Sequence, residues 1–506
     1  MNRPDKPEST LADKVTQGTA WTLSFRIVDR VIGMASTLIL VRLLSPADFG
    51  IVAMAMTIVA LIEVFTLAEF SSATIQHPSP SRDYYDSAWT LSFVFGAVST
   101  LLMLLFAKPI AGFFNEPKLA PVIVALSLIP LIDGLFNMGC VDFRKYLQFR
   151  KDFIFMSGRK LTGVIAVIPL AFIFRSYWAL VGGMIAGRLA GLVLSYLLHP
   201  FRPQFSFGSA TPLFRFSRWI ILNNALTFLS MRGAHLLIGR MSGATTLGTY
   251  TVAHEMASLP TSELAAPINR VMFPAYSKLS HDLSALRHGL LKVLGLIALI
   301  AIPAGLGMAS VAHLFVPVVL GDKWHAATPV IEILAVAGAI YVLQANIESL
   351  YFSLGRPRYK ALVTLAEACL FLPLAYYLLP RYGLEGVAFA FLVCASIAVP
   401  ANFLFATRLI GLRASQALGA VWRPLTAGAI MAIVVLLAFP PSIVRDDVWS
   451  NAEALALAIL LGAAIYATSL TLLWLASGRG PGAEEWVWSQ IKPRIARIVG
   501  GGTGGP

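Results

Sequence analysis

Charged and polar side chains occur inside segments that are otherwise strongly apolar. Arg26 and Arg30 lie one helical turn apart in the first such segment, with Asp29 beside them. Guanidinium groups bind phosphates through forked, paired hydrogen bonds. An ionisable group in an apolar helix is costly unless it faces water, a partner or a ligand. The pattern therefore predicts a binding site for a diphosphate anion, although an Arg–Asp bridge near the membrane interface would produce the same pattern.

Further polar residues recur in later apolar segments. Asn224, Arg232 and His235 share or border one face of segment 217–239, and Arg188 lies among small residues in the middle of another segment. We expect these four residues to line a substrate cavity together with the first arginine pair. For Arg188 a structural bridge between helices is an equally good interpretation, and a lone His such as His235 is often a packing residue.

Carboxylates in the same segments suggest energy coupling. Glu63 and Glu255 lie in apolar segments next to those that carry the arginines, and Asp29 lies beside Arg26. An intramembrane carboxylate carries H⁺ or Na⁺ in many transporters, and it can equally neutralise an arginine. Asp29, Glu63 and Glu255 are thus the candidates for ion coupling.

Enzyme chemistry finds no support in the sequence. The phosphate-binding loop G-x-x-x-x-G-K-[ST], the zinc motif H-E-x-x-H and the nucleophile elbow G-x-S-x-G are all absent. Cys140, Cys369 and Cys394 have neither metal-ligand spacing nor the pattern of a disulfide framework. We expect no metal, no cofactor and no enzymatic activity.

Composition identifies the setting of these residues. Of the 506 residues, 57% are hydrophobic and 13% are charged, with a mean hydropathy of +0.74. A soluble domain carries about 25% charged residues. The sequence therefore predicts one all-α polytopic membrane protein. The net charge of +13 does not indicate nucleic-acid binding, because no loop forms a basic domain with stacking aromatic residues.

Fourteen segments are long and apolar enough to be membrane spans, for which about 20 residues are needed. They lie near residues 18–42, 47–70, 85–107, 118–140, 155–174, 177–198, 217–239, 245–268, 289–312, 326–347, 360–379, 384–407, 420–439 and 452–476. The termini and even-numbered connections hold 27 of the 39 Lys and Arg residues, and the odd-numbered connections hold 8. Since positive charge favours the cytoplasmic side, we expect both termini in the cytoplasm.

An internal repeat defines the predicted domains. A shift of 198 residues superimposes the Trp-led first span and its Arg-to-Gly connection on the seventh span and its connection. Two copies of six spans insert the same way round, so an axis along the membrane normal should relate them. The predicted domains are residues 1–198 (spans one to six), 199–410 (spans seven to twelve) and 411–506 (two extra helices and a cytoplasmic tail).

Several ordered motifs resemble one family. They are Arg42–Gly50 (RLLSPADFG), Pro267–Leu279 (PINRVMFPAYSKL) followed by Asp282, Gly321–Trp324 (GDKW), Gly355–Pro357 (GRP) and Gly383–Ala388 (GLEGVA). The chain resembles the bacterial polysaccharide flippases of the multidrug/oligosaccharidyl-lipid/polysaccharide exporter superfamily, and is most similar to the colanic-acid-type exporters. The resemblance covers roughly residues 15–410.

This resemblance implies two six-helix lobes around a central cavity. It implies transport, by alternating access, of an undecaprenyl-pyrophosphate-linked oligosaccharide repeat unit across the inner (plasma) membrane for surface or exopolysaccharide synthesis. The implied partners are the lipid-linked oligosaccharide, membrane lipids, a polysaccharide polymerase and the export machinery, with no nucleic acid.

Three alternatives stay open on the sequence. A multidrug or cation antiporter on the same fold would need an acidic, aromatic cavity, which the intramembrane arginines disfavour. A membrane glycosyltransferase or polymerase would need a large extracytoplasmic loop with acidic residues, which the short connections do not provide. A related protein without transport activity would tolerate charge reversal at Arg26 and Arg30.

Overall fold

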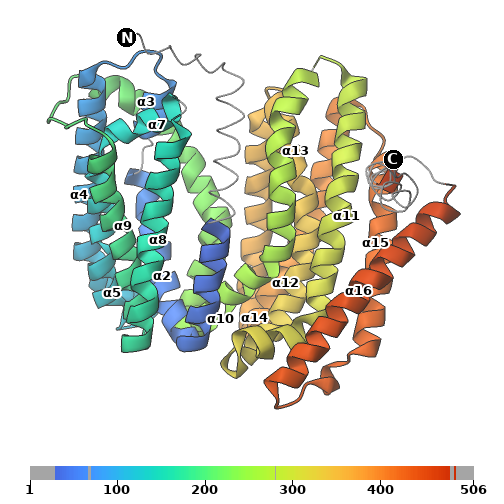
Figure 1. The fold of residues 1–506 in the computed structure, drawn as a ribbon. Helices are drawn as coiled ribbons and strands as arrows, with labels where there is room; N and C mark the ends of the chain where they lie inside the picture. Colours follow the sequence, from blue (N-terminus) through green and yellow to red (C-terminus); the bar gives the residue numbers. More distant parts are fainter. Residues whose placement is uncertain (1–28, 67–69, 147, 280, 479–483, 486–506) are drawn as a thin grey trace, which may run out of the picture. The chain divides into compact units, whose positions relative to one another are not determined.

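The computed structural model describes residues 29–66, 70–146, 148–279, 281–478 and 484–485. Every regular element in these ranges is a helix, and the chain forms two compact units, Met1–Gly248 and Thr249–Pro506 (Figure 1). We call them the N-terminal unit and the C-terminal unit. The boundary lies within α10, whereas the predicted domain boundary at residue 198 followed the internal repeat, so that division stays a prediction.

The N-terminal unit is a bundle of long helices and short connecting ones. Residues 29–43 are helical. The helices that follow are α2 (Pro46–Thr66), α3 (Phe70–Gln76), α4 (Arg82–Phe114), α5 (Leu119–Leu126), α6 (Leu128–Gly134), α7 (Val141–Lys145), α8 (Phe149–Phe174), α9 (Trp178–Leu198) and the first part of α10 (Ala210–Leu279).

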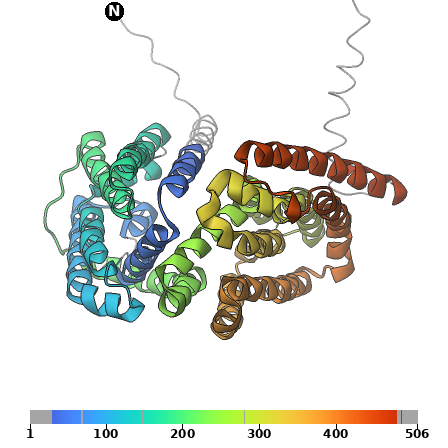
Figure 2. The same ribbon diagram turned by 90° about the horizontal axis from the view of Figure 1, so that it is seen from below.

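The C-terminal unit begins with the rest of α10. Its other helices are α11 (Leu283–Phe315), α12 (Thr328–Tyr341), α13 (Ala345–Ser353), α14 (Pro357–Ile410), α15 (Ala414–Ala438) and α16 (Val448–Ala476). Helix α16 packs on α11 and α15 at the edge of this unit (Figure 2). Helices α15 and α16 coincide with the predicted thirteenth and fourteenth spans.

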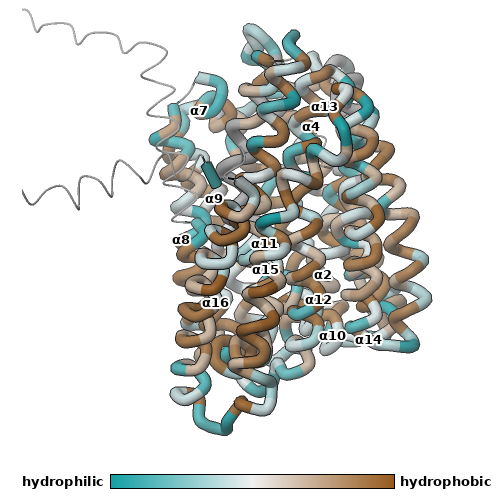
Figure 3. Tube along the Cα trace, turned by 90° about the vertical axis from the view of Figure 1, so that its right-hand side faces the viewer, coloured by the Kyte–Doolittle hydropathy of each residue, from teal (hydrophilic) through white to brown (hydrophobic). Residues whose placement is uncertain are grey.

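Side-chain caps fix where several of these helices start. The Ser81 hydroxyl accepts a hydrogen bond from the Tyr84 amide at the start of α4. Asp282 and Asp447 cap α11 and α16 in the same way. Such caps satisfy amides that have no partner within the helix. Hydrophobic residues dominate the middle of the helices, and hydrophilic residues gather mainly toward their ends (Figure 3).

Two predicted pairs of spans are joined end to end. Helix α10 contains the predicted seventh and eighth spans, and α14 contains the eleventh and twelfth. The breaks fall at Gly243 (φ 80°, ψ −177°) and Gly383 (φ 58°, ψ −140°). Only glycine adopts these angles readily, so one residue suffices to change the direction of the helix where a longer loop was expected.

The predicted count of fourteen spans is not confirmed. Among the described residues, nine helices are long and apolar enough to cross a membrane, or ten if the bent pair Leu119–Gly134 and Met138–Lys145 is one span. The first predicted span begins before residue 29, α14 holds two predicted spans, and α10 is not among the nine. The chain is an all-α, multi-pass membrane protein.

Close helix packing in the N-terminal unit depends on glycine. A Cβ atom at Gly50 of α2 would overlap the Ala244 carbonyl of α10, and one at Gly248 would overlap the Pro46 carbonyl. A Cβ at Gly183 of α9 would lie 3.1 Å from the Gly163 carbonyl of α8. Small residues allow this approach of backbones, which is a common basis of helix association in membranes.

Candidate functional site

The N-terminal unit contains a partly open cavity of about 720 Å³. This volume is typical of sites for one small organic ligand. Helices α2, α4, α6, α8, α9 and α10 contribute to its wall. Its charged and amide-bearing lining residues are Glu63, Asp133, Asn137, Arg144, Asp152, Arg159, Arg188, Asn224 and Arg232.

Two ion pairs cross the wall of this cavity. Arg188 Nη1 of α9 donates to Asp133 Oδ2 of α6 at 2.5 Å, and the Asp133 side chain is 11% exposed. Arg144 Nε donates to Asp152 Oδ1 at 3.3 Å. The other carboxylate oxygen of Asp133, Oδ1, is buried without a hydrogen-bond partner among the described residues. The Asp133–Arg188 pair is therefore short but half-satisfied.

Two other arginines of the cavity have no such partner. Within the described part of the chain, neither Arg159 nor Arg232 has a carboxylate oxygen within 4.0 Å. The Arg159 guanidinium carbon lies 5.6 Å from the centre of the Phe136 ring. Four arginines and three carboxylates thus line the cavity. An anion is the ligand that such a charge balance favours.

The packing of α8 against α9 places the two central arginines. A Cβ atom at Gly191 would lie 3.1 Å from Arg159 Cδ and 3.2 Å from Phe136 Cζ, and one at Gly187 would lie 3.1 Å from the Arg159 carbonyl. These two glycines flank Arg188 by one and three residues. The absence of their side chains lets Arg159 and its backbone lie against α9, beside Arg188.

The linker from α9 to α10 is tied to the start of α4. The Gln204 amide donates to Asp86 Oδ1 at 2.8 Å, and the Ser209 hydroxyl donates to Asp83 Oδ2 at 2.7 Å. The Ser206 amide donates to the Thr90 hydroxyl at 3.0 Å. These bonds fix the path of the linker that leads into α10, which carries Asn224 and Arg232.

The cavity brings together four residues singled out from the sequence: Arg188, Arg232, Asn224 and Glu63. The sequence left two interpretations of Arg188 open, a cavity residue or a bridge between helices. In the structure Arg188 both lines the cavity and pairs with Asp133. Their position in the cavity wall does not test whether these four residues bind a substrate, so their binding roles stay predictions.

The remaining candidates lie elsewhere or outside the described residues. Asp29 pairs with Lys160 at 3.4 Å. Arg30 and the buried His235 belong to the N-terminal unit but are not among the lining residues, and Glu255 is an exposed residue of the C-terminal unit. Arg26 lies outside the described residues. No group of three or more His, Cys, Asp or Glu in the described residues could hold a metal ion.

Five charged or amide-bearing lining residues were not singled out from the sequence: Asp133, Asn137, Arg144, Asp152 and Arg159. Of these, Arg159 is the arginine that lies inside a predicted span. It lies near the start of the predicted fifth span, 155–174, but was counted with the basic residues of the preceding connection. Helix α8 instead begins at Phe149, so Arg159 lies well inside the helix. The two glycines of α9, Gly187 and Gly191, were a usable signal, since small residues four positions apart predict the close approach of a neighbouring helix.

Comparison with known proteins assigns the family. The Polysaccharide biosynthesis protein family matches residues 39–329, which is more than half of the 506 residues. The chain belongs to this family. The lipopolysaccharide biosynthesis protein WzxC of Escherichia coli (strain K12) is 26% identical over 82% of this chain and 85% of that protein. The succinoglycan biosynthesis transport protein ExoT of Rhizobium meliloti (strain 1021) is 26% identical over 65% of this chain and 67% of that protein.

Solved structures agree on the fold of this polysaccharide biosynthesis protein. The lipid II flippase MurJ in an inward closed conformation has a TM-score of 0.74 at 14% identity, covering 90% of this chain and 99% of that chain. An inward-facing multidrug resistance MATE family transporter of the MOP superfamily has a TM-score of 0.58 at 16% identity, covering 76% and 94%. The resemblance inferred from the sequence motifs is confirmed, as is the expectation of a transporter that is not an enzyme.

Proposed function

We propose that this protein moves a lipid-linked oligosaccharide repeat unit across the inner membrane for surface or exopolysaccharide synthesis. The observation that carries the proposal is a cavity in the N-terminal unit lined by four arginines, two of which lack a carboxylate partner among the described residues. Family membership and the polysaccharide relatives support the class of cargo. The lipid diphosphate is the part of such a cargo that arginines would bind.

The transport cycle we propose is alternating access. Arg188, Arg232 and Asn224 would bind the diphosphate headgroup from the cavity while the polyprenyl chain stays in the bilayer. Arg26, Arg30 and His235 are further candidates for substrate binding, and Asp29, Glu63 and Glu255 for H⁺ or Na⁺ coupling. Proteoliposome transport that ignores both ion gradients would exclude coupling.

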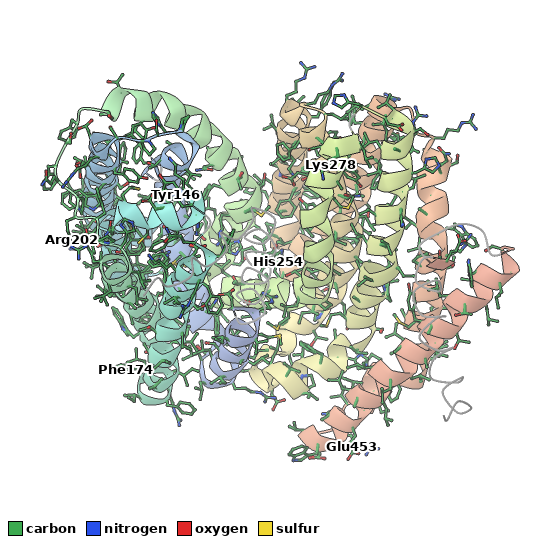
Figure 4. The ribbon with its side chains drawn as sticks, turned by 45° about the horizontal axis from the view of Figure 1, so that its top comes forward. Tyr146, Phe174, Arg202, His254, Lys278 and Glu453 are labelled. Atoms are coloured by element: carbon green, nitrogen blue, oxygen red, sulfur yellow. The ribbon has the colours of Figure 1, made fainter. Side chains whose placement is uncertain are left out.

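The topology that we propose has fourteen spans in two six-helix lobes, plus α15 and α16, with both termini in the cytoplasm. The distribution of Lys and Arg supports it. So does the placement of two residues at opposite ends of the C-terminal unit (Figure 4): Lys278 belongs to an even-numbered connection, and Glu453 lies at the start of the fourteenth predicted span, beside an odd-numbered connection. A polymerase and the export machinery are the partners expected to act next on the translocated unit.

Analysis of lipid intermediates tests this function. In a deletion strain we expect accumulation of a complete diphosphate-linked repeat unit, measured by mass spectrometry, together with loss of surface polysaccharide. Restoring the gene should reverse both effects. Unchanged lipid intermediates would contradict the proposal and favour the alternative, a multidrug or cation antiporter on the same fold, which drug-efflux assays would then examine.

A further inference from the structure

We propose that Arg159 anchors a diphosphate subsite in the N-terminal unit, and that Asp133 is an internal competitor which holds Arg188 until the anion displaces it. The proposal rests on the proposed function, because it assigns the headgroup of that cargo to particular side chains. It adds a residue that the sequence did not single out and gives the Asp133–Arg188 pair a role in binding.

Arg159 has the features of an anion-binding residue. It lines the cavity, and it has no carboxylate oxygen within 4.0 Å among the described residues. Its guanidinium lies over Phe136, and contact with a ring face does not use its N–H donors. The donors of Arg159 therefore remain available to a ligand in the cavity.

The Asp133–Arg188 pair is built for exchange. Only Oδ2 of the carboxylate accepts from Arg188, and the buried Oδ1 has no partner among the described residues. A phosphate group can accept two parallel bonds from one guanidinium. A phosphate could therefore form one more hydrogen bond with Arg188 than the Asp133 carboxylate, which accepts a single bond from it. Because Asp133 also lines the cavity, the released carboxylate remains at the cavity wall.

Exchange explains how a carrier can both hold and release a multiply charged headgroup. An unopposed arginine cluster would bind a diphosphate strongly and would be costly to leave empty inside the membrane. When the anion leaves, the Asp133 carboxylate pairs with Arg188 again. This competition reduces the net binding free energy of the anion, and it neutralises Arg188 when the site is empty. Efficient passage needs binding strong enough to admit the ligand and weak enough to release it.

Binding of inorganic pyrophosphate to the purified full-length protein tests the subsite. Calorimetric titrations in nanodiscs would compare wild type with Arg159→Gln, Asp133→Asn and the control Arg150→Gln, an exposed arginine in the first turn of the same helix. We expect about 10- to 100-fold weaker binding for Arg159→Gln, as for loss of hydrogen bonds to a charged group. We expect about fivefold tighter binding for Asp133→Asn and no change for Arg150→Gln.

The direction of the Asp133→Asn effect separates exchange from a merely structural clamp. If Asp133 only positions Arg188, its loss weakens binding or leaves it unchanged, and either result overturns the exchange. The double variant Asp133→Asn with Arg188→Gln should lose the gain in affinity. Wild-type affinity in Arg159→Gln would overturn the anchoring role. Size-exclusion profiles and melting temperatures establish that each variant is folded.

A second arm identifies the source of the diphosphate. Farnesyl diphosphate added to the nanodiscs should compete with inorganic pyrophosphate, which supports a lipid headgroup as the ligand; absence of competition overturns that assignment. The two proposals fail separately. Accumulated lipid intermediates in the deletion strain, with normal export and normal binding by Arg159→Gln, would reject only the subsite. Unchanged intermediates would reject the flippase function even if pyrophosphate binds.

Discussion

At the scale of single residues, the Asp133–Arg188 pair should contribute to stability as well as to binding. Replacing Arg188 by Met leaves a largely buried carboxylate without its counter-charge, since the Asp133 side chain is 11% exposed. Breaking such a pair costs roughly 3 kcal/mol. We expect a lower melting temperature for Arg188→Met in detergent. Replacing both residues, with Asp133→Leu, should recover most of the loss, and an additive double variant would contradict the pairing.

A cavity residue could be predicted from the sequence where the residues on both sides of it in the chain are apolar. Arg188, Glu63 and Arg232 stood out because they interrupt clear spans. Arg159 did not, because it follows the polar stretch 142–152 and the sequence offers no sharp signal for where α8 begins. Its surroundings depend on the tertiary approach of α9, which hydropathy along one helix does not encode.

At the scale of helices, the contact between α2 and α10 should be intolerant of any side chain at Gly50. A Cβ atom there would overlap the Ala244 carbonyl, and backbone cannot move aside as a flexible side chain does. Overpacking costs about 1–3 kcal/mol or more. We expect Gly50→Ala to lower the yield and melting temperature markedly. Gly112→Ala is the control, since nothing lies within 4 Å of its Cβ position in α4.

A buried polar network joins helices of the C-terminal unit. Glu367 of α14 accepts from Gln344 Nε2 at 2.9 Å and from the Tyr341 hydroxyl at 3.3 Å. Gln344 in turn accepts from Asn402 at 3.1 Å, and Asn402 accepts from the Tyr351 hydroxyl at 2.5 Å.

Removing the carboxylate from this network should be costly. Glu367→Ala leaves the buried Gln344 amide and the half-buried Tyr341 hydroxyl without their acceptor, a loss of about 2 kcal/mol. Glu367→Gln retains one acceptor oxygen and should cost less. Thermal unfolding of the two variants provides the comparison, and equal melting temperatures would show that the network does not stabilise the unit.

The end of α9 should make stability depend on pH. Burial lowers the pKa of His199 from its usual 6.5, against the opposing effect of Asp142, and Lys151 and Arg202 add to the lowering. The folded state therefore favours neutral His199. Stability from this group is complete above pH 6.5 and declines as pH falls below 6.5, because the unfolded chain takes up the proton first.

The measurement for His199 is a difference between two proteins. We expect the fall in melting temperature between pH 7.5 and pH 5.5 to be smaller in His199→Gln than in wild type. An identical fall in both would mean that other groups account for all of the acid sensitivity.

Sequence patterns predicted helices better than their connections. Helices α2, α4, α8, α9, α11, α15 and α16 each correspond to one predicted span. Helices α10 and α14 each correspond to two, because a single glycine makes a turn that a search for polar loops does not recognise. The predicted fourth span is instead the bent series from α5 to α7, where the direction changes by 68°.

At the scale of the whole molecule, the proposed orientation predicts which side each connection faces. Single cysteines at Gln204 and Asp446, both exposed positions, would be introduced after replacement of Cys140, Cys369 and Cys394. We expect a membrane-impermeant maleimide on intact cells to label the cysteine at 446, and the cysteine at 204 only after lysis. The reverse pattern would invert the topology.

The size of the cavity bears on how selective this carrier is toward sugars. About 720 Å³ suits a headgroup with little more than one attached ring, so most of a long glycan has to lie outside it. If the protein recognises mainly the diphosphate, it recognises the part of the cargo that different repeat units share. Such a carrier should accept foreign glycans built on the same lipid, which makes it a useful starting point for assembling unnatural polysaccharides in a bacterial host.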